Sequence, residues 1–556
     1  MPYQSTFKPL DISKCNILSY LFPEDQFLSN EPLWFSAADT SKSLSRRQML
    51  SWVKRFALGL EKLGVEENRA IMTFTPNHIY VPMAYLAAAG SKRIFTGANP
   101  VYTVEELAHQ MKTVEAGVVF IHPTLLEKGL AAAKKAGIPC ERIFQFADTE
   151  CEISLNIQDW RDMAASEGDA QLWKWDPLGE SSVNQIAAIN FSSGTTGLPK
   201  GVCVTHFNLV SNASQVTFTK FHGTGHSIHE ANPRNERWLA FLPLYHAYSQ
   251  LFTINLACKL EIPVYVMPHF GYQDFLSYIE RFRITSLQAI PPVLIMLAKR
   301  GETKNYDISS LRSIMCGAAP MALSLQNEIS ARFNVSITQS WGMTETTCVG
   351  TMTPGTTNDQ SGSIGFLLPN TEAKLVDLAE NEVQGDEEPG ELWLRGPQIM
   401  AKYWKNRQAT EETITENGWL RTGDIAIVRD NMWWIVDRKK ELIKVNGLQV
   451  APAELEAVLL RHPEVADVAV VGITIHGEEL PRAYVVLQQS APGGTSEVCI
   501  QDFVKERVAK HKALAGGVKF VEAIPKLGSG KIVRSTMKQW AKTDAAELEA
   551  QSKPRL

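Results

Sequence analysis

The sequence predicts an α/β protein: a large N-terminal domain of parallel sheets covered by helices, with a small β-rich unit, and a mobile α+β C-terminal domain. Apolar strand patterns and amphipathic helix patterns alternate from about residue 45, as in SRRQMLSWVKRFALGLEKLG, RAIMTF and HIYVPMAYLAAAG. Such alternation is typical of parallel sheets covered by helices. The length of 556 residues exceeds one hydrophobic core, and the pattern changes twice further along the chain.

The first change of pattern lies at about residues 361–430, where short strands alternate with turns in TEAKLVD, GELWLRG and WLRTGDIAIV. We expect a β-rich subdomain here, within an N-terminal domain of residues 1–436. After residue 436, helix, strand, strand, helix and strand patterns follow in APAELEAVLLRH, VADVAVVGI, RAYVVLQ, CIQDFVKERVAKH and VKFVEAI. They predict a compact C-terminal domain of residues 437–556, ending in a polar tail poor in helix.

Composition and charge argue against several classes of protein. The chain has 55 basic and 60 acidic residues, and its sequence contains no basic stripe that a nucleic-acid partner would need. No uncharged apolar run reaches the roughly 18 residues of a membrane-spanning helix, so we expect a soluble protein. Pro554, Arg555 and Leu556 resemble a peroxisomal import signal, which favours the peroxisome, with its import receptor as a partner, over the cytoplasm.

A glycine-rich loop gives the clearest sign of function. Residues 192–201 read SSGTTGLPKG, so backbone N–H groups and hydroxyls can converge on a phosphate without side-chain obstruction. A Walker loop would have Gly directly before Lys and would open a helix, whereas the flanks QIAAINFSS and GVCVTH have strand patterns. The loop therefore predicts a nucleotide site between two strands, formed by Ser192, Ser193, Gly194, Thr195, Thr196, Gly197 and Lys200.

Seven further motifs follow the loop. They are LPLYHAYS (242–249), CGAAP (316–320), QSWGMTET (339–346), GELWLRGPQIMAKYW (390–404), WLRTGDIA (419–426), VDRKKELIKVNGLQVAPAELE (436–456) and PKLGSGKIVR (525–534). In order and spacing, the loop and these motifs resemble the adenylate-forming superfamily. The closest likeness is to 4-coumarate-CoA ligase and its fungal relatives, over about residues 30–540.

The resemblance implies an acyl-CoA or aryl-CoA ligase that uses ATP, Mg²⁺ and CoA. Such an enzyme forms an acyl-adenylate, releases pyrophosphate and transfers the acyl group to CoA as a thioester. The attacking carboxylate is already ionised at neutral pH, so the reaction needs no general base. The barrier lies in bringing an anion up to a polyanion, because like charges about 4 Å apart repel by ~1 kcal/mol even in water. Cationic groups must therefore surround the reacting phosphate.

The resemblance also implies which residues bind the nucleotide. Glu345 would hold the Mg²⁺, Thr344 would contact the α-phosphate, and the glycine-rich loop would grip the β- and γ-phosphates. Asp424, assisted by Arg438, would bind the ribose hydroxyls, and Lys531 would reach the transition-state oxygens from the C-terminal domain. The remaining nucleotide-site residues, which match the adenine pocket and its surroundings, are Gly317, Ala318, Gln339 and Trp341.

An acyl pocket and a CoA surface are implied in the same way. His246, with a catalytic role, Tyr248 and Ser340 match acyl-pocket positions. For thioester formation the C-terminal domain would rotate about a hinge at Lys440 and present the catalytic Lys444. The residues matching the CoA surface are Asn446, Gly447, Gln449 and His269.

The chain departs from the family pattern at four of these positions. Ser340 and Trp341 stand where the family more often has Gly and Tyr, which puts plant-like coumarate specificity in doubt. Asn446 and His269 stand where Lys is frequent, which weakens the CoA assignment without redirecting it.

Other functions remain as alternatives to the ligase. They are an adenylation-only or luciferase-like enzyme and a catalytically silent nucleotide-binding relative. The presence of Glu345, Asp424 and Lys531 favours an active enzyme. Aromatic acids such as cinnamates or phenylacetate and medium-chain fatty acids are comparable substrate candidates, and the fungal likeness suggests secondary-metabolite biosynthesis.

Overall fold

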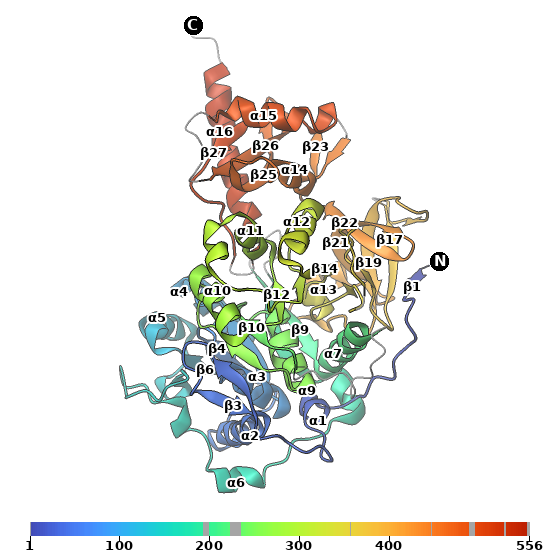
Figure 1. Ribbon diagram of the computed structural model, residues 1–556. Coiled ribbons are helices and arrows are strands. Elements are labelled where there is room, and N and C mark those ends of the chain that lie inside the picture. Colours follow the sequence, from blue (N-terminus) through green and yellow to red (C-terminus); the bar gives the residue numbers. More distant parts are fainter. Residues whose placement is uncertain are drawn as a thin grey trace.

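The first large sheet of the N-terminal domain contains the strands that flank the glycine-rich loop (Figure 1). The structure is a computed structural model that describes residues 2–192, 199–222, 235–355, 357–377, 379–445, 448–488, 495–527 and 530–552. The strand order is β20-β9-β8-β5-β4-β6-β7, parallel from β8 to β7 and antiparallel at β9 and β20. Its strands are β4 (Ala70–Phe74), β5 (Ile94–Ala98), β6 (Ala116–Ile121), β7 (Ile143–Gln145), β8 (Ile186–Ser192), β9 (Lys200–Thr205) and β20 (Lys402–Tyr403).

The second large sheet is also mainly parallel and has the order β16-β15-β14-β13-β12-β10-β11-β2-β3. Antiparallel pairing occurs at its ends, where β15 and β16 follow β14, and β3 pairs with β2. The strands are β2 (Pro32–Ser36), β3 (Ser43–Ser45), β10 (Trp238–Ala240), β11 (Val264–Val266), β12 (Ser286–Ala289), β13 (Ser313–Cys316), β14 (Ser336–Trp341), β15 (Thr351–Met352) and β16 (Phe366–Leu367).

Helices cover both sheets, as the alternating patterns predict. The N-terminus of α2 (Arg46–Lys62) is fixed by a capping box between Ser45 and Gln48. All residues of α3 (Val81–Gly90) are buried, and one continuous apolar core joins residues of both sheets. None of the described helices is long and apolar enough to cross a membrane. Other helices are α1 (Ile17–Leu21), α4 (Val104–Val114), α5 (Leu126–Ala136), α6 (Glu167–Gln171), α7 (His206–Phe221), α8 (Ala247–Ser249), α9 (Ala257–Leu260), α10 (Tyr272–Phe282), α11 (Pro291–Lys299), α12 (Leu323–Phe333) and α13 (Arg407–Thr413).

A third, antiparallel sheet forms the β-rich unit. Its order is β1-β17-β19-β21-β22, with β18 paired to β17. It takes in the N-terminal strand, which lies beside β17 in Figure 1, and extends past residue 430 to Arg438. The strands are β1 (Tyr3–Gln4), β17 (Glu372–Val376), β18 (Glu382–Val383), β19 (Gly390–Arg395), β21 (Leu420–Arg429) and β22 (Met432–Arg438).

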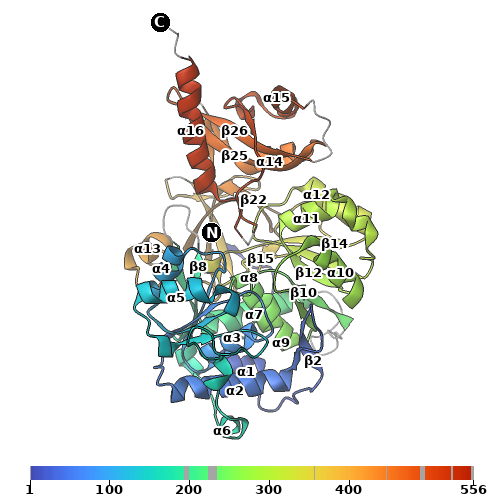
Figure 2. The same ribbon diagram turned by 90° about the vertical axis from the view of Figure 1, so that its left-hand side faces the viewer.

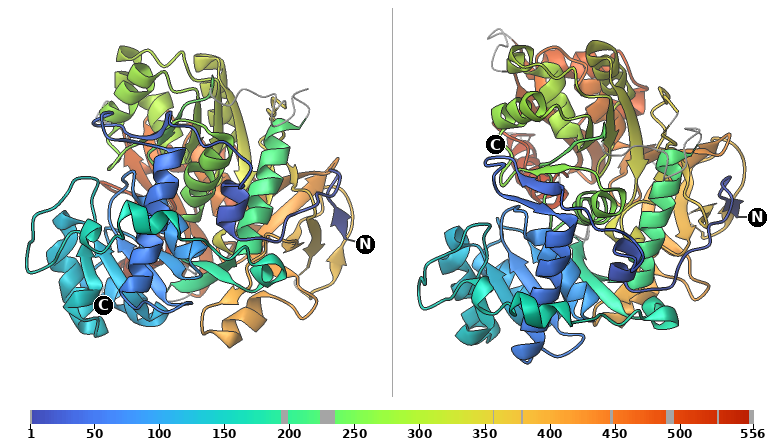
Figure 3. Two further views of the ribbon diagram at one scale, coloured as in Figure 1. Left: turned by 90° about the horizontal axis from the view of Figure 1, so that it is seen from below. Right: turned by 60° about the horizontal axis from the view of Figure 1, so that its bottom comes forward.

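Helix α7 ties the glycine-rich loop to the β-rich unit, which it borders in Figure 3. It begins directly after β9, where Thr205 caps its first turn. The Asn208 amide donates to the carbonyl of Pro397 over 2.8 Å, and the Asn212 amide donates to that of Val349 over 2.8 Å. These bonds place α7, the helix that follows β9, against the segments around residues 349 and 397.

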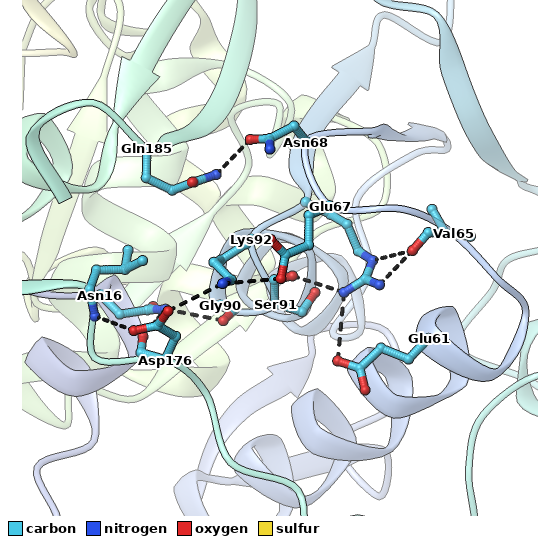
Figure 4. A network of polar contacts seen from close by, with 12 residues as sticks. Asn16, Glu61, Val65, Glu67, Asn68, Gly90, Ser91, Lys92, Asp176 and Gln185 are labelled. Atoms are coloured by element: carbon cyan, nitrogen blue, oxygen red, sulfur yellow. Dashed lines mark hydrogen bonds and ion pairs between the residues drawn. The ribbon is translucent and has the colours of Figure 1, made fainter. Parts of the chain in front are cut away.

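A polar network fixes the chain just before β8 (Figure 4). Lys92 pairs with Glu67 over 3.1 Å and with Asp176 over 3.2 Å, and hydrogen bonds to these carboxylates raise the pKa of Lys92. The Asn16 amide donates to the carbonyls of Gly90 and Asp176. The segment around Asp176, which precedes β8, is therefore anchored to residues beside the first sheet.

The C-terminal domain, at the top of Figures 1 and 2, has a three-stranded sheet among its described residues. β26 (Glu478–Leu487) pairs antiparallel with β25 (Val465–Ile475) and parallel with β27 (Val518–Phe520). A β-hairpin precedes this sheet, and helices pack against it. The remaining elements are β23 (Ile443–Val445), β24 (Leu448–Val450), α14 (Pro452–Leu459), α15 (Glu497–Lys505) and α16 (Arg534–Ser552).

The expected helix-poor tail is wrong, because α16 continues to Ser552. Met537, Ala541 and Leu548 recur at helical spacing and pack in one apolar cluster with residues of β25 and β26. On the same helix, Asp544 is buried and pairs with Arg482 over 2.8 Å. Apolar packing and this ion pair stabilise the helix, which the polar composition of the segment does not predict. The expected import signal at residues 554–556 lies outside the described residues.

Gly342, in the turn after β14, leaves no room for a side chain. A Cβ atom there would lie 1.7 Å from the carbonyl oxygen of Cys348. We expect Gly342→Ala to lower the free energy of unfolding by about 1–3 kcal/mol, as overpacking does, and to lower the unfolding temperature in calorimetry. Gly168→Ala in α6 is the control, since a Cβ there meets no atom within 4 Å. Equal unfolding temperatures for the two variants would contradict the prediction.

Candidate nucleotide-binding site

The ends of the glycine-rich loop lie side by side on antiparallel strands, as the sequence predicts. Ser192 of β8 faces Lys200 of β9 in the ladder. The loop itself, with Ser193, Gly194, Thr195, Thr196 and Gly197, lies outside the described residues. The Lys200 ammonium lies 4.9 Å from the centre of the Tyr403 ring, where the aromatic face attracts it.

Glu345 forms the acidic wall of the site. It lies in a single 3₁₀ turn, Thr344–Thr346, directly beyond β14, and its side chain is buried. Its Oε1 atom accepts hydrogen bonds from the Ser192 hydroxyl over 2.9 Å and from the Tyr403 hydroxyl over 2.7 Å. Since both bonds reach the same oxygen, Oε2 retains the capacity to bind a hard cation.

Tyr403 is a site residue that motif matching alone did not single out. It lies near the end of the motif GELWLRGPQIMAKYW, in the edge strand β20 beside β9. Its burial and its bond to Glu345 raise the pKa of its hydroxyl, so the phenol stays protonated and keeps donating. Thr344, adjacent to Glu345, is half-buried at the start of the same turn.

Asp424 has an ion-pair partner and a hydrogen-bond donor on two different elements. It faces Arg438 across the β21–β22 ladder, and the Arg438 Nε atom lies 3.3 Å from its Oδ1 atom. The indole Nε1 of Trp341 donates to Oδ2 over 2.8 Å. Asp424 is only 7% exposed, so these donors offset the cost of burying its charge. Each oxygen still has a lone pair that can accept a ribose hydroxyl.

The Trp341 ring packs into the apolar cluster of the β-rich sheet. A Cβ on Gly350 would lie 2.6 Å from the ring atom Cζ3, so the absence of a side chain there makes room for the indole. The ring contact and the bond to Asp424 connect the end of β14 to the β-rich unit.

Gly317 allows the predicted adenine-side and acyl-side residues to approach one another. A Cβ at Gly317 would lie 3.3 Å from the Ser340 hydroxyl oxygen and 3.6 Å from Tyr248 Cζ. Ala318 has a φ of 70°, which marks a tight turn after β13. Gln339 is buried on the neighbouring strand, and its amide donates to the Met321 carbonyl and to Gln326.

His246 and Tyr248, which the sequence predicts for the acyl pocket, lie at the start of α8. His246 Nδ1 accepts from the Tyr248 backbone N–H over 3.3 Å. Burial, with the nearby Lys531 ammonium, lowers the pKa of His246 to about 4, so the imidazole is neutral at pH 7. The Tyr248 hydroxyl donates to the Met315 carbonyl, and its ring meets Phe252 edge-on at 5.2 Å.

Lys531 enters this site from the C-terminal domain. Burial first, and the Arg438 cation second, lower its pKa to about 8, while Asp424, Glu345 and Glu441 act in the opposite direction. The lysine therefore lies within electrostatic reach of both acids of the nucleotide site.

The residues predicted for CoA occupy other places. Lys444 is exposed on β23, faces Gln449 on β24 in the hairpin, and donates its backbone N–H to Glu479 of the same domain. His269 is exposed between β11 and α10, close enough to His122 to lower the pKa of that imidazole, which burial lowers more. None of the described hydrogen bonds or ion pairs joins Lys444 or His269 to Lys531. Asn446 and Gly447 lie outside the described residues.

Lys440, the predicted hinge, is exposed in the turn after β22. Its carbonyl accepts a hydrogen bond from Lys538 of α16 over 3.3 Å. The turn thus directly follows the strand that carries Arg438 and precedes the hairpin that carries Lys444.

The paired strands that flank the glycine-rich sequence, a buried aspartate and a lysine from a second domain are an arrangement that suits a nucleotide-binding protein. The sequence profile of the AMP-binding enzyme family matches residues 23–404, and that of the AMP-binding enzyme C-terminal domain matches residues 454–531. The chain therefore belongs to the AMP-binding enzyme family.

Full-length relatives support this assignment. The chain is 34% identical over 535 residues to the acyl-CoA ligase azaF of Aspergillus niger, covering 94% of this chain and 98% of that protein. It is also 34% identical over 535 residues to the phenylacetyl-CoA ligase epaB of Aspergillus niger, covering 94% and 96%. For 4-coumarate–CoA ligase 1 of Arabidopsis thaliana the identity is 34% over 497 residues, covering 87% and 85%.

Solved structures share the fold. An anthranilate CoA ligase, AuaEII, in complex with anthranoyl-AMP matches with a TM-score of 0.84 at 22% identity, over 97% of this chain and 99% of that one. ATP-bound MatB from Rhodopseudomonas palustris matches with a TM-score of 0.83 at 23% identity, over 96% and 100%.

The Trp341–Asp424 bond generates a prediction about nucleotide affinity. We expect Trp341→Phe to keep an aromatic face but to raise the KM for ATP about fivefold, because a hydrogen bond to a carboxylate worth about 1 kcal/mol or more is lost. Steady-state kinetics with varied ATP measures this. Trp393→Phe is the matched control, since the buried Trp393 N–H has no hydrogen-bond partner among the described residues. An unchanged KM in Trp341→Phe, or an equal rise in the control, would contradict the role of the bond.

Proposed function

We propose that this protein is an ATP-dependent acyl-CoA or aryl-CoA ligase, an AMP-forming acid–thiol ligase. It joins a carboxylic acid to AMP, releases pyrophosphate, and then transfers the acyl group to the thiol of CoA. The observation that carries the proposal is Lys531 of the C-terminal domain lying within electrostatic reach of Asp424 and Glu345. The names of the relatives, acyl-CoA, phenylacetyl-CoA and 4-coumarate–CoA ligases, support it.

In the first half-reaction the protein binds and orients ATP. Asp424 accepts hydrogen bonds from the ribose hydroxyls. Ser192 and Lys200, at the two ends of the glycine-rich loop, direct the loop toward the β- and γ-phosphates. The acid carboxylate attacks the α-phosphorus, the bond to the bridging oxygen breaks, and pyrophosphate leaves. Lys531 neutralises charge that develops on the α-phosphate oxygens, and Thr344 donates to them.

Glu345 would hold Mg²⁺ through Oε2, the carboxylate oxygen that Ser192 and Tyr403 leave to a cation. The described residues contain no group of three His, Cys, Asp or Glu side chains that could hold a metal by themselves, so the phosphates would complete the ligand set. Bound Mg²⁺ neutralises phosphate charge and thereby lowers repulsion of the incoming carboxylate.

The acid substrate would lie between His246, Tyr248 and Ser340. A neutral imidazole adds no cation that would hold the carboxylate away from the phosphate, and it can donate a hydrogen bond through Nε2. Tyr248 and Phe252 give this pocket an aromatic wall. We therefore propose an acid with an aromatic or medium-chain apolar body, used in secondary-metabolite biosynthesis.

The second half-reaction requires a different surface of the C-terminal domain to face the nucleotide site. We propose that the C-terminal domain rotates about Lys440, withdraws Lys531 and presents Lys444, Asn446, Gly447 and Gln449, with His269 contacting CoA. The CoA thiol then attacks the acyl carbonyl and AMP leaves. Location in the peroxisome, through the last three residues and the import receptor, remains part of the proposal on sequence grounds.

An acid panel tests the ligase directly. Purified protein with ATP, Mg²⁺ and CoA is incubated with cinnamates, phenylacetate and medium-chain fatty acids, while pyrophosphate and CoA thioester are measured. We expect both products with at least one acid. We expect Lys531→Ala to release pyrophosphate about a hundredfold more slowly or worse, because the substitution removes a group that stabilises charge. Pyrophosphate without thioester would leave an adenylation-only enzyme, and neither product would leave a silent binding protein.

The lowered pKa of Lys531 predicts the pH dependence of the first half-reaction. The ammonium form is complete well below pH 8 and is lost as the pH rises through about 8. We expect kcat/KM for ATP, which reports the free enzyme, to fall above about pH 8. Lys531→Arg should retain some activity without this fall, because arginine stays charged. The same fall at the same pH in the arginine variant would show that another group titrates.

A further inference from the structure

Helix α11 (Pro291–Lys299) of the N-terminal domain contacts the C-terminal domain at both of its ends, and Figure 1 shows it directly below that domain. At the first end, a Cβ on Gly530 would lie 2.8 Å from Ile290 and 3.1 Å from Pro292. Gly530 immediately precedes Lys531. The start of α11 therefore supports the turn that carries the catalytic lysine.

At the second end, Lys299 reaches across the domain boundary. Its Nζ atom donates to the carbonyl of Leu460 over 3.1 Å and to the carbonyl of Val465. Leu460 is the residue that caps the C-terminal end of α14, where backbone carbonyls lack helical partners and the helix dipole favours a cation. Lys299 thus supplies charge and donors that this helix end needs.

The surroundings of Lys299 are charged and partly buried. Removal from water lowers its pKa, whereas Glu328 on α12 and Asp467 on β25 favour its charged form. Asp467 in turn pairs with Lys526 over 2.6 Å within the C-terminal domain. The lysine therefore lies between acids from both domains.

The N-terminal side of this contact is fixed. Leu294 and Leu297 of α11 are buried in the main core, and the Ala298 carbonyl accepts from Arg332 of α12 over 2.6 Å. Both acceptors of Lys299 move with the C-terminal domain. A rotation that carries Lys531 away from Asp424 also carries Leu460 and Val465 away from Lys299.

We propose that Lys299 is a positioning residue that latches the C-terminal domain in the orientation in which Lys531 completes the nucleotide site. Lys299 contacts no substrate. It favours the domain orientation that places Lys531 in the nucleotide site, and so it acts through Lys531. The inference rests on the proposed two-step function. It assigns Lys299 to acyl-adenylate formation and leaves thioester formation independent of it.

Two half-reaction assays test the latch with variants of the full chain. Lys299→Met keeps the length of the side chain and removes its N–H donors, Lys299→Arg keeps charge and donors, and Lys304→Met is the control at a nearby exposed lysine. Acid-dependent ATP–pyrophosphate exchange reads the first step. Thioester formation from CoA and preformed acyl-AMP reads the second, with the acid taken from the panel above.

We expect Lys299→Met to lower the exchange rate about tenfold, the size of one charge-assisted hydrogen bond, and to leave thioester formation unchanged or faster. Lys299→Arg should restore most of the exchange, and Lys304→Met should match the wild type. Equal losses in both half-reactions would indicate a merely structural role and overturn the latch. An unchanged exchange rate in Lys299→Met would overturn it as well.

Small-angle X-ray scattering reads domain orientation without catalysis. We expect the wild type and Lys304→Met to fit the arrangement in Figures 1 and 2, and Lys299→Met to depart from it. Identical scattering from Lys299→Met and the wild type would contradict the latch. If the wild type forms neither pyrophosphate nor thioester with any acid, the proposed function is wrong. The scattering comparison still tests whether Lys299 holds the C-terminal domain in this orientation.

Discussion

The electrostatic attraction between Lys531 of the C-terminal domain and the carboxylates of Asp424 and Glu345 is the interaction on which the proposed chemistry depends. A polyphosphate and a carboxylate repel each other, and cations must offset that repulsion where water is excluded. The β-rich sheet contributes Arg438 and the start of β9 contributes Lys200, whereas the third cation, Lys531, belongs to the C-terminal domain, which has an apolar core of its own. Because Lys531 lies on the C-terminal domain, the proposed rotation of that domain would remove this cation from the two acids.

Neutral donors contact both acids of the site, and one of the two acids also has a cationic partner. Glu345 accepts hydrogen bonds from Ser192 and Tyr403. Asp424 accepts a hydrogen bond from Trp341 and forms an ion pair with Arg438. Hydroxyl and indole donors orient a buried carboxylate without adding a charge. In the proposed function, these donors leave Glu345 Oε2 to bind a metal ion and leave lone pairs on the Asp424 oxygens to accept hydrogen bonds from ribose hydroxyls.

Local patterns predict much of this architecture from sequence. Alternating strand and helix signals locate β4, α2 and α3, and strand patterns on both sides of the loop predict the Ser192–Lys200 pairing. Local patterns do not predict contacts between segments that lie far apart in the sequence. Trp341 and Asp424 are 83 residues apart, and Lys299 and Leu460 are 161 apart. The sequence pattern does not reveal α16, because the few apolar residues of this helix stabilise it only by packing on β25 and β26.

A crystal structure with a non-hydrolysable ATP analogue, α,β-methylene ATP, tests the central claim most directly. The account predicts the ribose hydroxyls on Asp424, the triphosphate between the loop and Glu345, and the Lys531 ammonium within about 3 Å of an α-phosphate oxygen, as a hydrogen bond requires. A nucleotide bound elsewhere, or bound here with Lys531 turned away into solvent, would contradict it.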